Sequence, residues 1–372
     1  MQVQVPARVP ALEPRRGASA AIGSAGASAG AGASSAMGSA GASGAGAGSG
    51  AGGGAMAAGF ALLSTANGLA AYLAATSLLG AGFALLANVP STFVIAQTVS
   101  ARRRNFMIGA YLSAGGAGGV AGPLLAHALI EGGEDWRLYW RLSMVVMLSL
   151  TAGFLFFADS RFLKNSPQAA ATPQADKTAP HDWTLKEALR SPVFYLIGGA
   201  LMAAYFCGVS VSSWAVTHLT GLGLSAGFAS AMLSLHAASN ALARAAGGVA
   251  VKAVRARYLL IAGLGAEAVG MLALSFASTS AMAIIFALFE GFAFGMILFA
   301  TTVLTIEYFG LKNSPAILGS MNLFATIAML GPTLTGFTGD AFGSFSPIFI
   351  VYGLGAGALA IAGLFAHNPN ER

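Results

Sequence analysis

Long uncharged apolar runs, separated by short polar breaks, fill the chain from about residue 49 to residue 366. A helix rises about 1.5 Å per residue, so roughly 20 apolar residues cross the roughly 30 Å hydrocarbon core of a bilayer. The sequence therefore predicts an all-α protein with ten membrane-spanning helices. They are expected at residues 49–68, 71–98, 105–130, 138–158, 192–218, 225–247, 258–277, 281–304, 316–337 and 346–366.

The apolar sequence repeats itself at a shift of 209 residues without a gap. The matched positions pair Gly82 with Gly291, Thr92 with Thr301, Arg103 with Lys312, and Pro123 with Pro332. Repeats of this length are typical of secondary transporters built from two equivalent helical bundles, with the substrate path between them. We expect the spans from residue 258 onward to superpose on residues 49–158.

Composition supports the membrane interpretation. Only 9% of the 372 residues are charged, 56% are hydrophobic, and the mean hydropathy is +0.72, which leaves too little polar surface for a water-soluble globule. The net charge of +6 comes from basic residues at the ends of apolar runs, not from a patch with interleaved aromatics. We therefore expect lipid as a partner and no nucleic acid.

Basic residues also predict the orientation. If the ten spans alternate, 17 of the 19 Lys and Arg residues fall on one side, and only Arg137 and Arg141 fall on the other. The positive-inside rule makes the first side cytoplasmic. Both termini are then cytoplasmic, in a membrane expected to be the bacterial inner membrane.

The chain divides into five regions. The Gly-, Ala- and Ser-rich stretch at 17–55 is read either as a flexible leader or as a weak helix whose small residues pack closely. The polar segment 159–191 reads as a mobile linker with a short amphipathic stretch near its end. The expected regions are a leader at 1–48, a truncated N-terminal bundle at 49–158, a cytoplasmic linker at 159–191, a six-helix C-terminal bundle at 192–366 and a tail at 367–372.

Several motifs together resemble the major facilitator superfamily of secondary transporters. They are the basic turn Arg102, Arg103 and Arg104 followed by Gly109; Gly118, Gly122 and Pro123 in the next span; Trp136-Arg137; Arg244 with Gly247-Gly248; Glu307-Tyr308-Phe309-Gly310; and Gly331-Pro332 with Gly336, Gly339 and Asp340. The resemblance implies transport of a small solute by alternating access, driven by a gradient. The arrangement looks most like the branch with oxalate/formate-type and monocarboxylate carriers, which implies an organic anion as substrate and a proton as a candidate coupling ion.

The chain also departs from the family pattern. We expect the family's first two helices to be missing, because the repeat places their equivalents where only the small-residue leader stands. The cytoplasmic Gly-x-x-x-Asp-Arg-x-Gly-Arg turn is absent near residues 35–48. A non-transporting relic or a membrane interaction protein is therefore the alternative interpretation.

Two acids, Glu290 and Glu267, lie deep in spans, where a carboxylate costs roughly 2.5–3.5 kcal/mol on insertion scales. Glu290 stands beside Gly291 in a span that lines the central cavity in the resembling family. We expect Glu290 to face the space between the bundles, with structural pairing to another helix as the alternative. Glu267 is expected to have a structural or protonated role.

Other polar residues within spans are candidates for substrate binding or coupling. His236 and Asn240 lie one turn apart on one helix face and lead toward Arg244. Histidine titrates near neutral pH and a buried amide can orient a polar substrate, although an interhelical hydrogen bond would account for either residue. Weaker candidates are Tyr205, Asn322 and Tyr111.

The remaining motif residues are expected to have structural or gating roles: Arg102, Arg103, Arg104, Gly118, Gly122, Pro123, Arg244, Gly331 and Pro332. No Walker A, HExxH or Ser/His/Asp pattern occurs, and Cys207 is the only cysteine. We therefore expect no enzymatic activity, no cofactor and no metal site.

The topology can be tested by cysteine labelling. Cysteines introduced at Ser166 and Gly133 should react with a membrane-impermeant reagent from opposite sides, because the linker and the loop before residue 138 are expected on different faces of the membrane. Labelling of both positions from the same side would contradict the ten-span topology.

Overall fold

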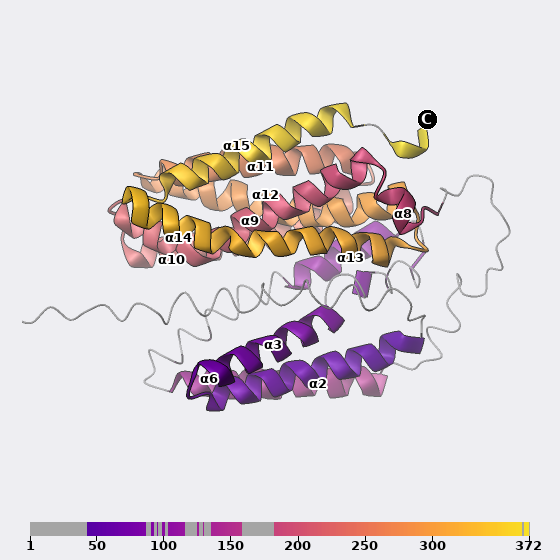
Figure 1. Ribbon diagram of the computed structural model, residues 1–372, viewed down its shortest axis with the longest axis horizontal. Helices are drawn as coiled ribbons and strands as arrows, with labels where there is room; N and C mark the ends of the chain where they lie inside the picture. The colour runs from indigo at the N-terminus through magenta and orange to yellow at the C-terminus, as the bar shows by residue number, and fades with distance from the viewer. Residues whose placement is uncertain are drawn as a thin grey trace, which may run out of the picture.

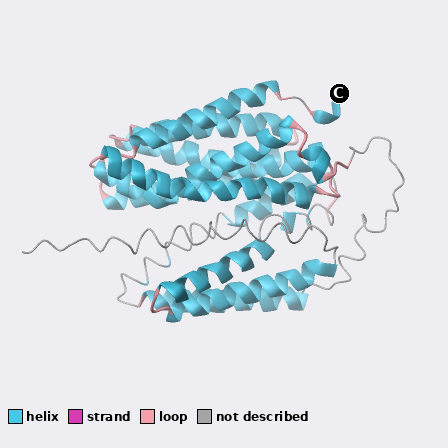
Figure 2. Ribbon diagram, viewed as in Figure 1, coloured by secondary structure: helices cyan, strands magenta, loops and turns pink. Residues whose placement is uncertain are grey.

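The computed structural model describes residues 43–86, 91–92, 95, 99–100, 103–115, 125, 129, 135–157, 182–366 and 368–371, with side chains from residue 50 onward. Within these ranges every regular element is helical (Figure 2). The expected sites Arg102, Gly118, Gly122 and Pro123, and most of the expected leader and linker, lie outside the described residues.

The helices form two groups that lie side by side in Figure 1. The first contains α2 (Ser43–Thr65), α3 (Leu69–Leu86) and α6 (Trp136–Phe157), with α2 packed against both of the others. The guanidinium of Arg137, at the start of α6, donates to the Asn67 Oδ1 in the α2–α3 turn at 2.8 Å. This bond ties the beginning of α6 to the beginning of α3.

The second group contains the helices from α8 to the C-terminus. They are α8 (Leu185–Ala188), α9 (Pro192–Gly221), α10 (Ala226–Ala250), α11 (Ala256–Ser275), α12 (Ser280–Phe309), α13 (Ser314–Ala325), the 3-10 turn η2 (Thr326–Leu330), α14 (Gly331–Phe342), α15 (Ser346–Phe365) and the 3-10 turn η3 (Pro369–Glu371). In this part of the chain the helix bounds agree with the expected spans to within about five residues. Helix α12 is largely enclosed, since it packs against α9, α10, α11 and α13.

Prolines and small hydroxyl residues explain where these helices begin. Proline stands in the first turn of α9, α13, α14 and α15, where its missing N–H would have no helical acceptor in any case. Ser225 and Thr279 cap α10 and α12 by accepting from the backbone N–H groups of Phe228 and Met282. The polar breaks seen in the sequence are thus real helix ends.

The span expected at 316–337 consists of α13, η2 and α14, with the α-helix interrupted at η2. Pro332 lacks an N–H and its ring crowds the carbonyl one turn earlier, which explains why α13 gives way to the tighter η2 before α14 begins. Two side chains bond to backbone carbonyls at this break: the Trp214 indole donates to Pro332 O at 2.8 Å, and the Tyr352 hydroxyl donates to Gly331 O at 3.2 Å. The Gly331-Pro332 motif therefore marks a break in the helical hydrogen bonding that is held against α9 and α15.

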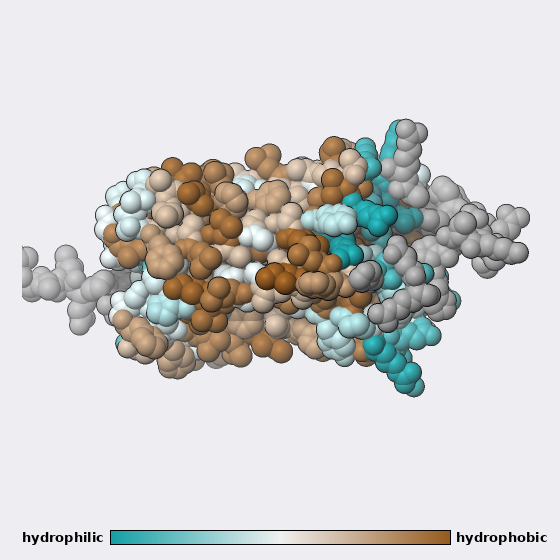
Figure 3. All heavy atoms as spheres, turned by 90° about the horizontal axis from the view of Figure 1, so that it is seen from above, coloured by the Kyte–Doolittle hydropathy of each residue, from teal (hydrophilic) through white to brown (hydrophobic). Residues whose placement is uncertain are grey.

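The molecule presents an apolar surface to its surroundings. Seven helical stretches in the described residues are long and apolar enough to cross a membrane, with Ser314–Phe342 counted as one. Helices α2 and α10 are not among them, because α2 is rich in small residues and α10 carries His236, Asn240 and Arg244. The face in Figure 3 shows a hydrophobic belt and a hydrophilic end, the end at which Figure 1 places α8. The count of ten spans stays a prediction.

Helix α2 starts at Ser43, six residues before the expected boundary and inside the small-residue stretch. A side-chain carbon at Gly59 would lie 2.7 Å from Leu79 Cγ, and one at Gly82 would lie 2.6 Å from Gly52 O. The close packing considered as an alternative for this stretch therefore applies to its last part. Glycine lacks the side chain that would separate the two backbones.

The end of the linker is anchored on the second group. The expected amphipathic stretch is a single helical turn, α8, closed by reciprocal bonds between Thr184 and Glu187. The Trp183 N–H donates to Phe309 O at 3.0 Å, and the Asn313 amide donates to Trp183 O at 2.8 Å. These bonds attach the chain before α9 to the turn between α12 and α13.

The close contact between Gly59 of α2 and Leu79 of α3 predicts that a larger side chain destabilises the protein at this position of α2 and not at every position. Gly59→Leu should lower the unfolding free energy by about 1–3 kcal/mol, the usual cost of overpacking. Gly54→Leu is the matched control, because nothing lies within 4 Å of a side-chain carbon there. Thermal unfolding in detergent measures both, and equal melting temperatures would contradict the packing.

Candidate functional site

Three polar side chains form a stripe along α10, at His236, Asn240 and Arg244. Their spacing of four residues puts them on one face of the helix. That face can approach α12 closely because α12 has glycine opposite it. A side-chain carbon at Gly291 would lie 2.3 Å from His236 O, and one at Gly295 would lie 2.3 Å from Asn240 O. The polar stripe therefore lies directly against α12.

At the first position of the stripe, the His236 Nε2 forms an ion pair with the Glu290 carboxylate of α12. The Glu290 side chain has no exposed surface, whereas 11% of the His236 side chain is exposed. The imidazole also stacks on Phe286, with ring planes 6° apart. The pair joins α10 to α12 inside the second group of helices.

This position differs from the one expected for Glu290, which was the space between the bundles. Glu290 instead packs on Gly270 of α11, whose missing side chain would collide with the Glu290 backbone at 2.6 Å. A carboxylate in an apolar interior is stable only when a cation or a hydrogen-bond donor reaches it, and His236 supplies that partner. Whether Glu290 serves transport stays a prediction.

A second buried carboxyl lies beside this pair. Glu267 of α11 has no exposed surface, and neither of its oxygens has a hydrogen-bond partner among the described residues. The Cys207 thiol of α9 is its neighbour, and Glu290 is close enough to interact with it electrostatically. Sequence reasoning considered Cys207 only for disulfide or metal chemistry. The described residues contain no group of three ligands fit for a metal ion.

Arg244, the last residue of the stripe, reaches the first half of the chain. Its guanidinium donates to Leu112 O at 2.9 Å, in the helical segment 103–115, and lies 5.8 Å from the centre of the Phe294 ring. The Tyr205 ring also packs on Phe294, edge to face with ring centroids 5.9 Å apart. Arg244 is buried, and its Nε has no partner among the residues described.

Glycine again permits the contact between α10 and the segment 103–115. A side-chain carbon at Gly109 would lie 2.7 Å from Arg244 O, and one at Gly248 would lie 3.2 Å from Asn105 O. The Ser113 hydroxyl donates to Ala241 O at 2.8 Å across the same contact. The two halves of the chain therefore touch backbone to backbone at the Arg244 end of the stripe.

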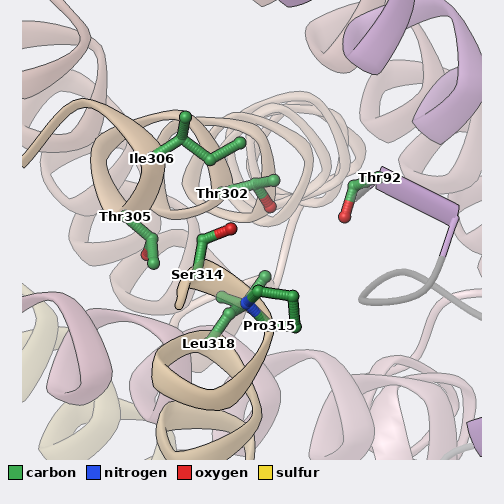
Figure 4. Close-up of a pocket in the computed structure, with 7 residues that line it drawn as sticks. All are labelled: Thr92, Thr302, Thr305, Ile306, Ser314, Pro315 and Leu318. Carbon is green, nitrogen blue, oxygen red and sulfur yellow. The ribbon is translucent and has the colours of Figure 1, made fainter. Parts of the chain in front are cut away.

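A small hollow marks another meeting point of the two halves (Figure 4). Its lining residues are Thr92 from the first half and Thr302, Thr305, Ile306, Ser314, Pro315 and Leu318 from α12 and α13. The hydroxyls of Thr302 and Thr305 donate to carbonyls of α12, and the hydroxyl of Ser314 donates to Leu311 O in the turn before α13. The room inside it, about 10 Å³, is about enough for one water molecule and far below the roughly 300–1,000 Å³ of typical ligand pockets.

Of the three weaker candidates, Tyr205 and Tyr111 lie near Arg244, and Asn322 bonds within its own helix. Tyr205 lies beside Phe294 and interacts with Arg244, and Tyr111 lies on the segment 103–115 that Arg244 contacts. The amide of Asn322 donates to Leu318 O of its own helix α13. Arg103 and Arg104 begin the segment 103–115, where their N–H groups bond to Ser100 O.

The sequence profile of the Major Facilitator Superfamily matches residues 19–248, which is more than half of the chain. The chain belongs to the Major Facilitator Superfamily. The resemblance read from the sequence motifs is thereby confirmed at the level of the superfamily. No curated protein sequence matches the chain.

Solved structures of Major Facilitator Superfamily transporters share the fold. The E. coli fucose:proton symporter FucP matches with a TM-score of 0.66 and 15% identity, over 93% of this chain and 89% of that one. FucP in the outward conformation gives 0.66 and 16%, over 96% and 91%. The human organic anion transporter MFSD10 gives 0.65 and 16%, over 93% and 82%. Identity this low shows a common fold and leaves the chemistry to the residues of this chain.

The buried ion pair in this superfamily member predicts a non-additive effect on stability. His236→Leu should lower the unfolding free energy by about 3–5 kcal/mol, since it leaves the Glu290 charge buried and unpaired. The double variant His236→Leu/Glu290→Met should be more stable than the single variant, because the unpaired charge is gone. Equilibrium unfolding in mixed micelles measures both.

The control for these variants is the ion pair at the protein surface between a guanidinium nitrogen of Arg137 and a carboxylate oxygen of Asp135, which lie 3.5 Å apart. Asp135→Asn should cost less than about 1 kcal/mol, because solvent screens that pair. A double variant at His236 and Glu290 as unstable as His236→Leu alone would contradict a buried charge pair.

Proposed function

We propose that the protein is a secondary active transporter that moves a small organic anion across the membrane by alternating access between its two groups of helices. The single observation that carries the proposal is Arg244, a buried cation where the two halves meet. Family membership supports transport rather than catalysis. The narrower placement among oxalate/formate-type and monocarboxylate carriers belongs to the same proposal.

The surroundings of Arg244 favour an anion over a neutral solute. In the described part of the chain, no carboxylate forms an ion pair with Arg244, and its only hydrogen bond there goes to a neutral backbone carbonyl. A buried charge is costly unless an opposite charge approaches it. The planar guanidinium fits a carboxylate with two parallel hydrogen bonds, which makes a carboxylate the ligand that best matches this site.

The other groups near Arg244 suit the remainder of a small carboxylate. Asn240 Oδ1 has no hydrogen-bond partner among the described residues, so an acceptor is left for a hydroxyl group of the substrate. The rings of Phe294 and Tyr205 offer an apolar wall beside the guanidinium. We assign Arg244 to substrate binding, in place of the structural or gating role that the sequence motif suggested for it. Asn240 is assigned to the same role and Tyr205 to the wall of the site.

The structural neighbours are compatible with this class of solute. MFSD10 is described as an organic anion transporter and FucP as a fucose:proton symporter. We take a proton as the coupling ion and the bacterial inner membrane, with both termini cytoplasmic, as the location. The orientation rests on the uneven division of basic residues between the two sides.

Uptake by proteoliposomes tests the proposal. The parent chain should take up at least one labelled anion from a panel of formate, oxalate and lactate, and Arg244→Gln should weaken its binding at least about tenfold. The reason is that a hydrogen bond to a charged group contributes about 1.5–3 kcal/mol, and 1.4 kcal/mol corresponds to tenfold.

The matched control is Arg257→Gln, which removes an arginine that bonds to the carbonyls of Gly363 and Leu364 at the end of the bundle. Arg257→Gln should leave anion affinity unchanged. Uptake of labelled fucose with no uptake of any anion would contradict the assignment of substrate class. The absence of uptake of every solute would favour the alternative of a non-transporting membrane protein.

A further inference from the structure

Four titratable side chains meet in the interior of the second group of helices, one from each of α9, α10, α11 and α12. They are Cys207, His236, Glu267 and Glu290, and we call them the four-helix polar cluster. The two carboxyls have no exposed surface, and Cys207 is 1% exposed. The organic anion proposal uses none of these residues.

A charge count shows that the cluster is incomplete. Two carboxylates and one protonated histidine would carry a net charge of minus one. An unbalanced charge in an apolar interior is strongly unfavourable, and among the described residues the Cys207 thiol is the one donor beside Glu267. The cluster is neutral only when it holds one proton more than the His236–Glu290 pair requires.

The described groups on the surrounding helices do not supply the missing positive charge. On α9, His218 Nε2 bonds to Leu274 O, and Tyr205 faces Arg244. On α15, Tyr352 faces Cys207 but is neutral, and its hydroxyl bonds to Gly331 O. Arg244 lies eight residues beyond His236, about 12 Å along α10.

We propose that the four-helix polar cluster is a proton-binding site, and that its exchangeable proton is the coupling ion of the transporter. Loading transfers a proton from hydronium to a carboxylate, which gives a carboxylic acid and water. His236 is the entry point, because its side chain is 11% exposed, more than that of any other member of the cluster. Its imidazole passes the proton to Glu290, and the two carboxyls share it next to Cys207.

The position of the cluster relative to Arg244 determines whether proton binding strengthens or weakens anion binding. When the cluster loses its proton it carries a negative charge, which attracts Arg244 and repels an anion bound there. When the cluster is loaded it is neutral, and the full attraction of Arg244 is available to the anion. Proton and anion should therefore bind cooperatively and travel in the same direction. At about 12 Å and an effective dielectric constant of about 20, the effect on anion affinity is about tenfold.

Infrared difference spectroscopy tests the site without any transport. The purified protein in lipid nanodiscs should show a protonated-carboxyl band that changes across a pH series and shifts on exchange into D₂O. Glu267→Gln should remove this pH-dependent change, because the cluster then becomes neutral without an extra proton. Asp340→Asn, at an exposed acid of α14, is the control and should leave the change intact.

Anion binding by the same variants tests the coupling, which rests on the proposed function. For an anion of the panel that the parent binds, affinity should fall about tenfold as pH rises, and Glu267→Gln should keep the tight affinity at every pH. Glu290→Gln gives a second reading if Glu267→Gln does not fold, and it should weaken the pH dependence in the same way.

The outcomes separate the two proposals. If the infrared change is missing from the parent or survives both glutamine substitutions, the proton site is refuted even where anion transport is found. If the infrared change depends on Glu267 but the pH dependence of anion affinity does not, the coupling role is refuted. If no anion binds the parent, the proposed function fails, and the infrared result alone decides whether the proton site exists.

Discussion

Close approach of helix backbones at glycine determines where the polar side chains of this protein meet. Gly291 and Gly295 let α12 lie against α10, and only at that separation can Glu290 reach His236. Gly109 and Gly248 allow the same closeness between α10 and the segment 103–115, which brings Leu112 O to Arg244. In lipid the hydrophobic effect does not drive helices together, so packing of small residues and hydrogen bonds between helices must do it.

The second constraint is that buried polar groups need partners. Most of them find one inside the second group of helices: the Trp214 indole bonds to Pro332 O, His218 to Leu274 O, and Ser346 to Ser275 O. Arg244, Asn240 and Glu267 are among those that leave a buried polar atom without a hydrogen-bond partner in the described part of the chain. Since such atoms cost free energy in the resting protein, they indicate where a ligand or a proton would be stabilised.

Much of the fold could be predicted, because helix ends in a membrane protein have strong local signals. The bounds of α9, α12 and α15 were predicted to within about five residues. The signals were the prolines at the starts of α9 and α15 and the polar turns on either side of α12. The start of α2 at Ser43 could not be predicted in this way. Its glycines and alanines are poor helix signals by themselves, and they form a helix because α3 and α6 pack against them.

The site was predicted less completely, because its chemistry depends on contacts between helices. The spacing of His236, Asn240 and Arg244 could be read from the sequence, since it depends on one helix alone. The direction of Glu290 could not, because it is set by Gly270 and by the proximity of α10. Cys207 gave no signal at all, since a lone cysteine in an apolar span is usually a small hydrophobic residue.

Helix α10 has a special place in this arrangement, because it carries both the histidine of the four-helix polar cluster and the arginine that contacts the first half of the chain. A charge change at the cluster, acting over about 12 Å at an effective dielectric constant of about 20, amounts to roughly 1.4 kcal/mol at Arg244. Coupling free energies between linked sites are typically about 1–3 kcal/mol. The direct electrostatic effect is therefore large enough to link proton and anion without a rearrangement of α10. A rigid helix in glycine contact on two sides suits that role, because it holds the distance between the two charges constant while the halves of the protein move.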